Sequence, residues 1–317
     1  NDFKNIIPVL DNLEELEEYT SKTSKDFNIG IRCATDEEPT FEFYTSRLGI
    51  RYSEITNYYI NEISKVPNVK LKILHFFINT GVKDSTYYWS ELSKLVHQYC
   101  KLSKMCPDLD TLDIGGGFPI KTSLNFDFDY EYFINEIIKM IQSICASYNV
   151  KEPHIITEFG SYTVGESGAM IYKVLKAKQQ NDKERWYMID SSFITNMPDT
   201  WAINQRFIML GINNWSNEYS KVNLGGLTCD SQDYYNSEAH DHNIYLPKYT
   251  PPEEQYIGFF HTGAYQESIG GYGGIQHCLI PNTKHVLVQE NEQGVLVDQL
   301  FEEEQTSESM LKILGYL

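Results

Sequence analysis

Three consecutive glycines, in the stretch LDTLDIGGGFPI at residues 109–120, follow an apolar run with the composition of a buried strand. Because Gly115, Gly116 and Gly117 carry no side chains, another group can approach their backbone closely, and their N–H groups can face an anion. The stretch has neither the G-x-G-x-x-G pattern of dinucleotide-binding proteins nor the G-x-x-x-x-G-K-S/T pattern of a P-loop. From these residues alone, a phosphate-binding loop and a structural turn both stay open.

A carboxylate, Glu158, ends the apolar run HIITEFG at residues 154–160. We expect this run to form a strand buried on both faces, where an unpaired charge is unfavourable. A salt bridge or a helix cap would neutralise the charge, and so would the protonated ring nitrogen of a ligand. These interpretations also stay open on the residues alone.

Two later motifs contain groups that can transfer protons or bind ligands. In GGLTCDSQDYY, residues 225–235, Cys229 precedes Asp230, and Asp233 follows three positions later. Most single cysteines only fill space in a core, but the flanking glycines and carboxylates predict that Cys229 is partly exposed. In HTGAY, residues 261–265, an apolar strand ends before Tyr265, which an ordinary strand end also explains.

The elements that position these residues follow two patterns. Up to about residue 160, apolar runs that start near residues 6, 28, 71, 111 and 155 alternate with amphipathic helical segments. This alternation predicts parallel βα units with right-handed crossovers, which bind ligands at the carboxyl ends of their strands. Five strands suffice for a doubly wound sheet, whereas a barrel of about eight would need roughly three more before residue 1.

Beyond about residue 165 the pattern changes to short strands and turns, with no long helix before SESMLKILGYL at the end. This pattern predicts an all-β domain. We therefore expect two domains, residues 1–164 from a (β/α) fold and residues 165–317 mainly of β-structure.

Charge and cysteine usage limit the class of protein. The 317 residues include 26 basic and 44 acidic ones, a net charge of −18 that argues against nucleic-acid binding and is compatible both with cationic substrates and with solubility alone. The six cysteines show no metal-ligand spacing, so we expect no metal site and reduced thiols in the cytoplasm. No segment has the length and hydropathy of a membrane span.

Taken in order, five segments resemble the pyridoxal-phosphate (PLP)-dependent decarboxylases of the alanine-racemase-like fold, which act on ornithine, arginine and diaminopimelate. The segments are TSRLGI after IGIR, LDIGGGFP, TEFGSY, GGLTCDSQD and HTGAY. The resemblance covers nearly the whole chain. It implies an α/β fold, a (β/α)8 TIM-like barrel followed by an all-β domain, and a homodimer that shares its active sites across the interface.

The resemblance assigns the cofactor contacts. Gly115, Gly116 and Gly117 would hold the phosphate of PLP, with Tyr265 also reaching it. Glu158 would pair with the pyridine nitrogen and keep it protonated, so that the ring accepts electrons as CO₂ leaves.

The resemblance also assigns groups that act on the substrate. Cys229 would protonate the resulting carbanion at Cα, acting across the dimer interface. Asp230 would contact the distal cationic group of the substrate. Asp199, in NMPDTW, is a second candidate for that contact.

The chain departs from the family pattern at several positions. The family has an arginine where this chain has Ser161 and a proline where it has Phe159, so one phosphate contact is either lost or supplied by another group. The histidine that stacks on the cofactor ring aligns with Phe77, while His75 lies two residues earlier on the same strand face. We prefer Phe77, because that register places Thr80 at the family's phosphate-contacting serine.

The largest departure concerns the lysine that binds PLP covalently, which in the family lies on an early barrel strand. No lysine here matches it. We therefore expect the 317 residues to be the C-terminal part of a longer enzyme, with the lysine on roughly 130 to 150 further residues, judged from typical domain size.

The amino-acid sequences of the motifs most resemble those of the biosynthetic arginine decarboxylases of bacteria. This resemblance predicts conversion of L-arginine to agmatine and CO₂ in polyamine biosynthesis. Ornithine, diaminopimelate and carboxynorspermidine are alternative substrates. A hypothesis of a different class is a non-catalytic homologue that resembles the antizyme inhibitors.

Overall fold

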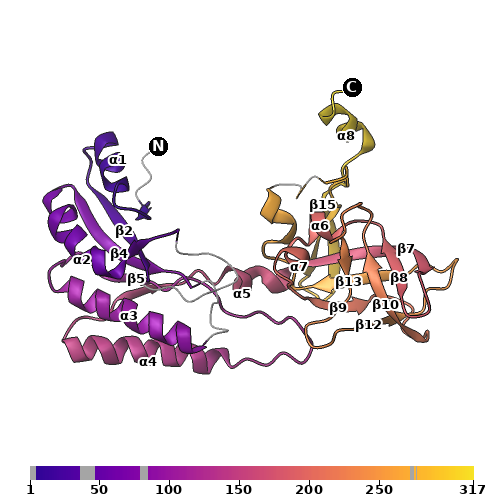
Figure 1. Ribbon diagram of the computed structural model, residues 1–317, viewed down its shortest axis with the longest axis horizontal. Helices are drawn as coiled ribbons and strands as arrows, with labels where there is room; N and C mark the ends of the chain where they lie inside the picture. The colour runs from indigo at the N-terminus through magenta and orange to yellow at the C-terminus, as the bar shows by residue number, and fades with distance from the viewer. Residues whose placement is uncertain (1–4, 36–46, 79–84, 272–274, 276) are drawn as a thin grey trace. The chain divides into compact units, whose positions relative to one another are not determined.

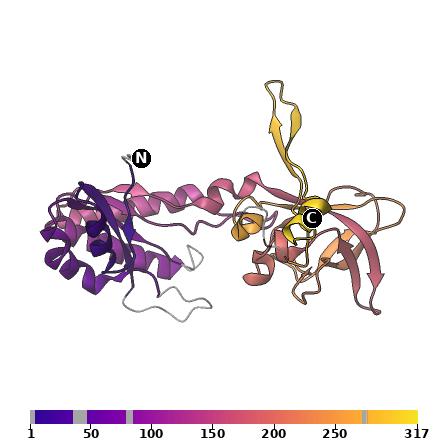
Figure 2. The same ribbon diagram turned by 90° about the horizontal axis from the view of Figure 1, so that it is seen from above.

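The computed structural model describes residues 5–35, 47–78, 85–271, 275 and 277–317 (Figures 1 and 2). The chain forms two compact units. Unit 1 comprises residues 1–119 and 128–162, and unit 2 comprises residues 120–127 and 163–317. Within the described ranges, no helix is both long and apolar enough to cross a membrane.

The sheet of unit 1 consists of parallel strands. They are β1 (Val9–Leu10), β2 (Phe27–Ala34), β3 (Ile50–Arg51), β4 (Val69–Phe76), β5 (Thr111–Asp113) and β6 (His154–Ile156). Their spatial order is β1-β2-β4-β5-β6, with β3 also paired to β2, and every pairing is parallel. The main path follows the order of the chain, as in a barrel, whereas the order reverses in a doubly wound sheet. The sheet is open, so these residues do not close a barrel.

Helices cover this sheet (Figure 1). They are α1 (Glu15–Lys22), α2 (Tyr52–Asn61), the 3-10 helix η1 (Ile63–Lys65), α3 (Ser85–Ser103) and α4 (Tyr130–Tyr148). The short α5 (Gly160–Val164) follows β6 in the chain. Helix α4 begins where the side chain of Asp129 accepts a hydrogen bond from the N–H of Tyr132. Its core face recurs every fourth residue, with Phe133, Ile137, Ile141 and Cys145 all buried.

The expectation that the strand before Glu158 is buried on both faces is wrong. All three residues of β6 are exposed, and the side chain of Glu158 is 50% exposed. The reason is topological, because β6 is the last strand of the described sheet and only β5 pairs with it. The side chain of Glu158 is therefore half-exposed among the described residues.

Unit 2 contains a curled seven-stranded sheet. Its strands are β7 (Ala169–Gln179), β8 (Arg185–Ile189), β9 (Ile208–Gly211), β10 (Tyr219–Gly225), β11 (Tyr234–Tyr235), β12 (Ile244–Pro247) and β13 (Tyr256–Phe260). The order is β11-β10-β8-β7-β13-β9, with β12 paired to β10, and all pairings except β8–β10 are antiparallel. Its core is aromatic, with Phe259 edge-on to Tyr172, Phe193 and Tyr235.

Short helical segments and a hairpin complete unit 2. The helical segments are η3 (Gly165–Ser167), α6 (Phe193–Asn196), α7 (Asp199–Ala202), η4 (Gln266–Gly270) and α8 (Ser307–Ile313). The hairpin consists of β14 (His285–Glu290) and β15 (Leu296–Glu302), which pair only with each other among the described strands.

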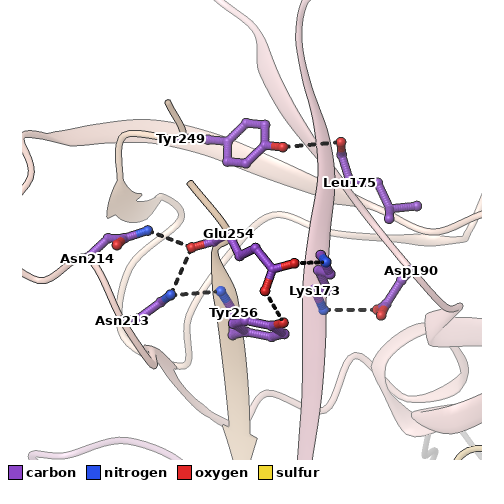
Figure 3. A network of polar contacts seen from close by, with 8 residues as sticks. All are labelled: Lys173, Leu175, Asp190, Asn213, Asn214, Tyr249, Glu254 and Tyr256. Carbon is purple, nitrogen blue, oxygen red and sulfur yellow. Dashed lines mark hydrogen bonds and ion pairs between the residues drawn. The ribbon is translucent and has the colours of Figure 1, made fainter. Parts of the chain in front are cut away.

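A polar network around Glu254 ties β7, β13 and the loop after β9 together (Figure 3). The carboxylate of Glu254 contacts Lys173 Nζ and accepts a hydrogen bond of 2.7 Å from Tyr256 Oη. Its backbone carbonyl accepts hydrogen bonds from the side-chain amides of Asn213 and Asn214, at 2.8 and 2.9 Å. These contacts fix the start of β13, the strand that leads into the HTGAY motif.

Candidate active site

The glycine run after β5 passes between two neighbouring segments of backbone. A Cβ on Gly115 would lie 2.5 Å from the carbonyl oxygen of Phe76, and one on Gly116 would lie 2.7 Å from that of Glu158. Gly115 and Gly117 also have φ values of +64° and +101°, which favour glycine. The glycines are therefore required by packing against the ends of β4 and β6, whatever ligand the loop binds.

The backbone N–H and carbonyl of Gly115 are hydrogen-bonded, whereas the N–H groups of Gly116 and Gly117 are available to a ligand. The N–H of Gly115 donates to Asp113 Oδ1 at 3.0 Å, and its carbonyl accepts from the N–H of Glu158 at 2.9 Å. Among the described residues, no group accepts from the N–H of Gly116 or Gly117. Two successive donors at the carboxyl end of a parallel sheet can bind an anion.

A histidine and two carboxylates lie beside this loop. His75 on β4 and Asp113 on β5 are register partners, so their side chains lie on the same face, and Glu158 follows two residues after Ile156, the partner of Asp113 on β6. His75 Nε2 lies 3.7 Å from Glu158 Oε2. One ligand atom from each of the three lies within 4.8 Å of the others, a spacing that a metal ion would also accept.

Burial dominates the electrostatics of this cluster. It lowers the pKa of His75, although Asp113 and Glu158 both favour the imidazolium. It also raises the pKa of Asp113, an effect opposed by the hydrogen bond from Gly115. His75 Nε2 is buried and has no hydrogen-bond partner in the described part of the chain. A buried nitrogen without a hydrogen-bond partner is unfavourable, so the site can gain free energy by binding a polar ligand here.

The two departures after Glu158 have a structural consequence. The ring of Phe159 stacks on Phe118, with centroids 3.8 Å apart and an angle of 15°. This stack joins the segment after Glu158 to the end of the glycine run. Ser161 lies on α5, half-buried, at the position where the family has its arginine.

Phe77 and Thr80 complete the predicted residues of unit 1. Phe77 lies just after β4, 38% exposed, and its ring lies 5.8 Å from the guanidinium carbon of Arg32. Thr80 lies outside the described residues. Of the two alternatives for the stacking group, only His75 belongs to the cluster with Glu158.

In unit 2, Asp233 organises the loop that carries Cys229 and Asp230. Its buried carboxylate accepts hydrogen bonds from the N–H of Phe193 at 2.8 Å, and from the N–H and Oγ1 of Thr228 at 3.0 and 2.7 Å. Cys229 and Asp230 are exposed at the tip of this loop. The sequence pointed to the exposed pair, while the structural role of Asp233 depends on a partner 40 residues away.

Asp199 and the HTGAY turn are linked in the same unit. Gln266, buried beside Tyr265, donates from Nε2 to Asp199 Oδ2 at 2.8 Å. Burial raises the pKa of Asp199, and this hydrogen bond opposes the shift. Tyr265 itself is 60% exposed and has a φ of +64°, an unusual value for a tyrosine.

Residues 4–165, about half of the chain, match the sequence model of a family described as pyridoxal-dependent decarboxylase, pyridoxal binding domain. The chain belongs to this family of pyridoxal-dependent decarboxylases. The matched range contains His75, the three glycines and Glu158.

Curated relatives of the decarboxylase family include two named activities. The biosynthetic arginine decarboxylase of Prochlorococcus marinus (strain MIT 9215) is 23% identical, over 99% of this chain and 66% of the relative. The diaminopimelate decarboxylase of Staphylococcus aureus (strain COL) is 26% identical, over 82% of this chain and 62% of the relative. This chain therefore spans less than two thirds of the length of these relatives.

Solved decarboxylases share the fold. The biosynthetic arginine decarboxylase of Campylobacter jejuni matches with a TM-score of 0.81 at 19% identity, over 99% of this chain and 66% of that one. A variant of Helicobacter pylori diaminopimelate decarboxylase complexed with L-lysine matches with a TM-score of 0.77 at 18% identity, over 98% and 73%. Such identities establish the fold and leave the substrate to be determined.

The cluster in unit 1 fits the family's cofactor. PLP has a phosphate and a pyridine nitrogen, and the unit offers two glycine N–H groups for the first and a half-exposed carboxylate, Glu158, for the second. The buried His75 Nε2, which has no hydrogen-bond partner among the described residues, lies 3.7 Å from that carboxylate. The two N–H groups and the carboxylate thus match the two polar ends of the cofactor.

Proposed function

We propose that the protein containing this chain is a PLP-dependent decarboxylase of a basic amino acid, and that its substrate is L-arginine, which it converts to agmatine and CO₂. The observation that carries the proposal is the carboxylate of Glu158 beside His75 and two available glycine N–H groups, within the pyridoxal-binding domain. The choice of arginine is supported by the arginine decarboxylases among the relatives.

In unit 1 the proposed roles are binding and orientation. PLP, when bound, supplies a ring that accepts the electron pair released as CO₂ departs. Gly116 and Gly117 bind its phosphate through their N–H groups, and Glu158 holds a proton on the ring nitrogen. We place His75, rather than Phe77, against the ring, because His75 already contacts Glu158.

In unit 2 the proposed roles concern the substrate. A cysteine thiol of ordinary pKa already keeps its proton near neutral pH, as a donor to Cα must, and contact with the Cys278 thiol raises the pKa of Cys229 further. Asp230 and Asp199 supply carboxylates for the distal cation, and Tyr265 reaches the cofactor phosphate. Gln266 leaves one oxygen of Asp199 for such a contact.

The assembly follows the family in our proposal. Residues 1–164 are part of a (β/α)8 barrel, residues 165–317 form the β domain, and two copies share each active site, with Cys229 acting across the interface. We place the enzyme in the cytoplasm.

The test is decarboxylation by the full-length gene product loaded with PLP. L-arginine, L-ornithine, meso-diaminopimelate and carboxynorspermidine are supplied separately, and CO₂ release is measured together with the amine formed. We expect agmatine from arginine and a much lower kcat/KM for the others. Absence of CO₂ from arginine, with release from another substrate, would overturn the arginine assignment and leave the decarboxylase assignment standing.

A second candidate is a non-catalytic binding protein, favoured by Ser161 at the position of the family's phosphate-binding arginine. The two candidates differ in their spectra. An enzyme purified with PLP absorbs visible light from covalently bound cofactor, and borohydride reduction fixes the cofactor to one peptide. A protein that shows neither property, and no CO₂ release, is the binding homologue.

A further inference from the structure

Two exposed cysteines of unit 2 contact each other. Cys229 Sγ and Cys278 Sγ lie 3.7 Å apart, although the residues are 49 positions apart in the sequence. The other four cysteines of the chain are buried. A thiol pair that is both close and accessible can react with a small molecule in solution.

A histidine lies on the other side of the pair. His277 Nε2 is 3.7 Å from Cys278 Sγ. In one tautomer of the neutral ring this nitrogen carries no proton and is a hydrogen-bond acceptor. In that tautomer it is placed to take up the proton as the Cys278 sulfur attacks a disulfide. Cys278 is therefore the thiol equipped to react first, and Cys229 is placed to react second.

We propose that Cys229 and Cys278 form a reversible disulfide, with a low-molecular-weight disulfide such as oxidised glutathione as the oxidant. A disulfide has an S–S bond of about 2.05 Å, so the sulfurs must approach by about 1.7 Å from their present separation. The bond removes the thiol of Cys229, and in this respect the inference rests on the proposed function, because Cys229 is the proposed proton donor.

The exchange balances in two steps. The Cys278 thiolate attacks one sulfur of oxidised glutathione, forms a mixed disulfide and releases one glutathione thiolate. The Cys229 thiolate then attacks the Cys278 sulfur and releases the second glutathione. Two protein thiols are oxidised, one glutathione disulfide is reduced to two thiols, and the two protons from the cysteines end on the released glutathione. Excess reduced glutathione reverses both steps.

The chain contains a matched internal control. Cys100 Sγ and Cys145 Sγ are also 3.7 Å apart, but both side chains are fully buried in unit 1. Burial raises the pKa of Cys100 to about 12, so this pair lacks both a thiolate and access for glutathione. Distance alone would treat the two pairs alike, whereas our inference predicts that only the exposed pair reacts.

Trypsin separates the four cysteines. Cleavage after lysine places Cys229 in residues 222–248, Cys278 in 249–284, Cys100 in 95–101 and Cys145 in 140–151. The full-length enzyme with bound PLP is equilibrated at graded ratios of oxidised to reduced glutathione, quenched with acid, alkylated and digested without reductant. Mass spectrometry then measures each linked pair.

We expect the peptides of Cys229 and Cys278 to become linked as the ratio rises, and those of Cys100 and Cys145 to stay alkylated. Linkage should vanish after dithiothreitol. In Cys278→Ser, Cys229 should carry a glutathione adduct at most, and basal turnover should persist under reducing conditions. Separate adducts on Cys229 and Cys278 without linkage, or linkage of both pairs alike, would overturn the inference.

The activity readout separates this inference from the proposed function. If both hold, the linked enzyme loses about 10²-fold or more in kcat, as expected on removal of a general acid, and dithiothreitol restores it. If the link forms while activity is unchanged, the disulfide stands and Cys229 is not the proton donor. If no link forms in an enzyme that decarboxylates, the inference about the thiol pair is wrong and the function stands.

Discussion

His75 lies between two carboxylates that favour its charged form, and it is nevertheless held neutral. Burial outweighs both attractions, so its pKa is lowered. A neutral imidazole can lie flat against an aromatic ring without carrying an unpaired charge into the site. Glu158 differs from it, because its side chain is half-exposed and lies where a protonated ring nitrogen can pair with it.

The lowered pKa of His75 predicts how stability depends on pH. At pH values between the native pKa of His75 and its unfolded value of about 6.5, the unfolded state binds more protons than the native state. The contribution of neutral His75 to the free energy of unfolding is therefore fully present above pH 6.5 and decreases as the pH falls below that value. We expect the cofactor-free protein to lose more free energy of unfolding between pH 7.5 and 5.5 than His75→Gln does, as measured in urea. An NMR titration midpoint for His75 above 6.5 would contradict this assignment.

Cys229→Ala tests the proton donor. We expect the loaded enzyme to keep its cofactor absorption and to lose about 10²- to 10⁴-fold in kcat, because a general acid contributes that much to proton transfer. The matched control is Cys278→Ala, which removes the neighbouring thiol and should retain turnover, since a lone thiol is still protonated near neutral pH. Equal turnover by wild type and Cys229→Ala would assign the proton to another group.

Among the elements, the loop between β5 and α4 owes its course to backbone packing. Gly116→Ala should cost about 1–3 kcal/mol of stability, because its Cβ would meet the Glu158 carbonyl, and the variant should also bind PLP more weakly. The control is Gly160→Ala, whose Cβ meets nothing within 4 Å and which begins α5. Urea unfolding and a PLP titration measure both effects. If the two variants behave alike, close packing is not why glycine is needed at residue 116.

The sequence predicted elements best where their pattern is local. Helix α4 has such a pattern, because Phe133, Ile137 and Ile141 repeat every fourth position after Asp129. Strand β7, the longest in the described chain, is hard to predict, because Ile171 and Leu175 on its exposed face hide the alternation of buried Tyr172 and Val174. The exposure of Glu158 was missed, since nothing local shows that β6 lies at a sheet edge.

The residues of the candidate site also differ in whether a local sequence pattern reveals them. The glycines and Glu158 belong to contiguous motifs and could be found from the sequence, whereas the contact of His75 with Glu158 spans three strands of the sheet. The contacts of Cys229 with Cys278 and of Asp199 with Gln266 join residues 49 and 67 positions apart. Such pairings depend on tertiary packing and leave no signal in a single sequence.

At the scale of the whole molecule, the net charge of −18 gives the protein a negative field that attracts cations from solution. We expect the KM for L-arginine to rise by about two- to tenfold between roughly 20 and 500 mM salt, because salt screens that attraction. The inhibition constant of L-citrulline, a close analogue with a neutral side chain, should change little. A KM that is independent of salt would mean that the acidic surface serves solubility alone.

The two sheets also differ in how far apart along the chain their paired strands lie. In unit 1, neighbouring strands along the order β1-β2-β4-β5-β6 are paired in the order in which they are synthesised. In unit 2, β7 pairs with β13, and 76 residues separate Gln179 from Tyr256. At a synthesis rate of about 5–20 residues per second, the edge of β7 that pairs with β13 stays unpaired for about 4–15 s. During nascent-chain synthesis this unpaired edge is open to a chaperone, and slower translation after residue 179 would lengthen its exposure.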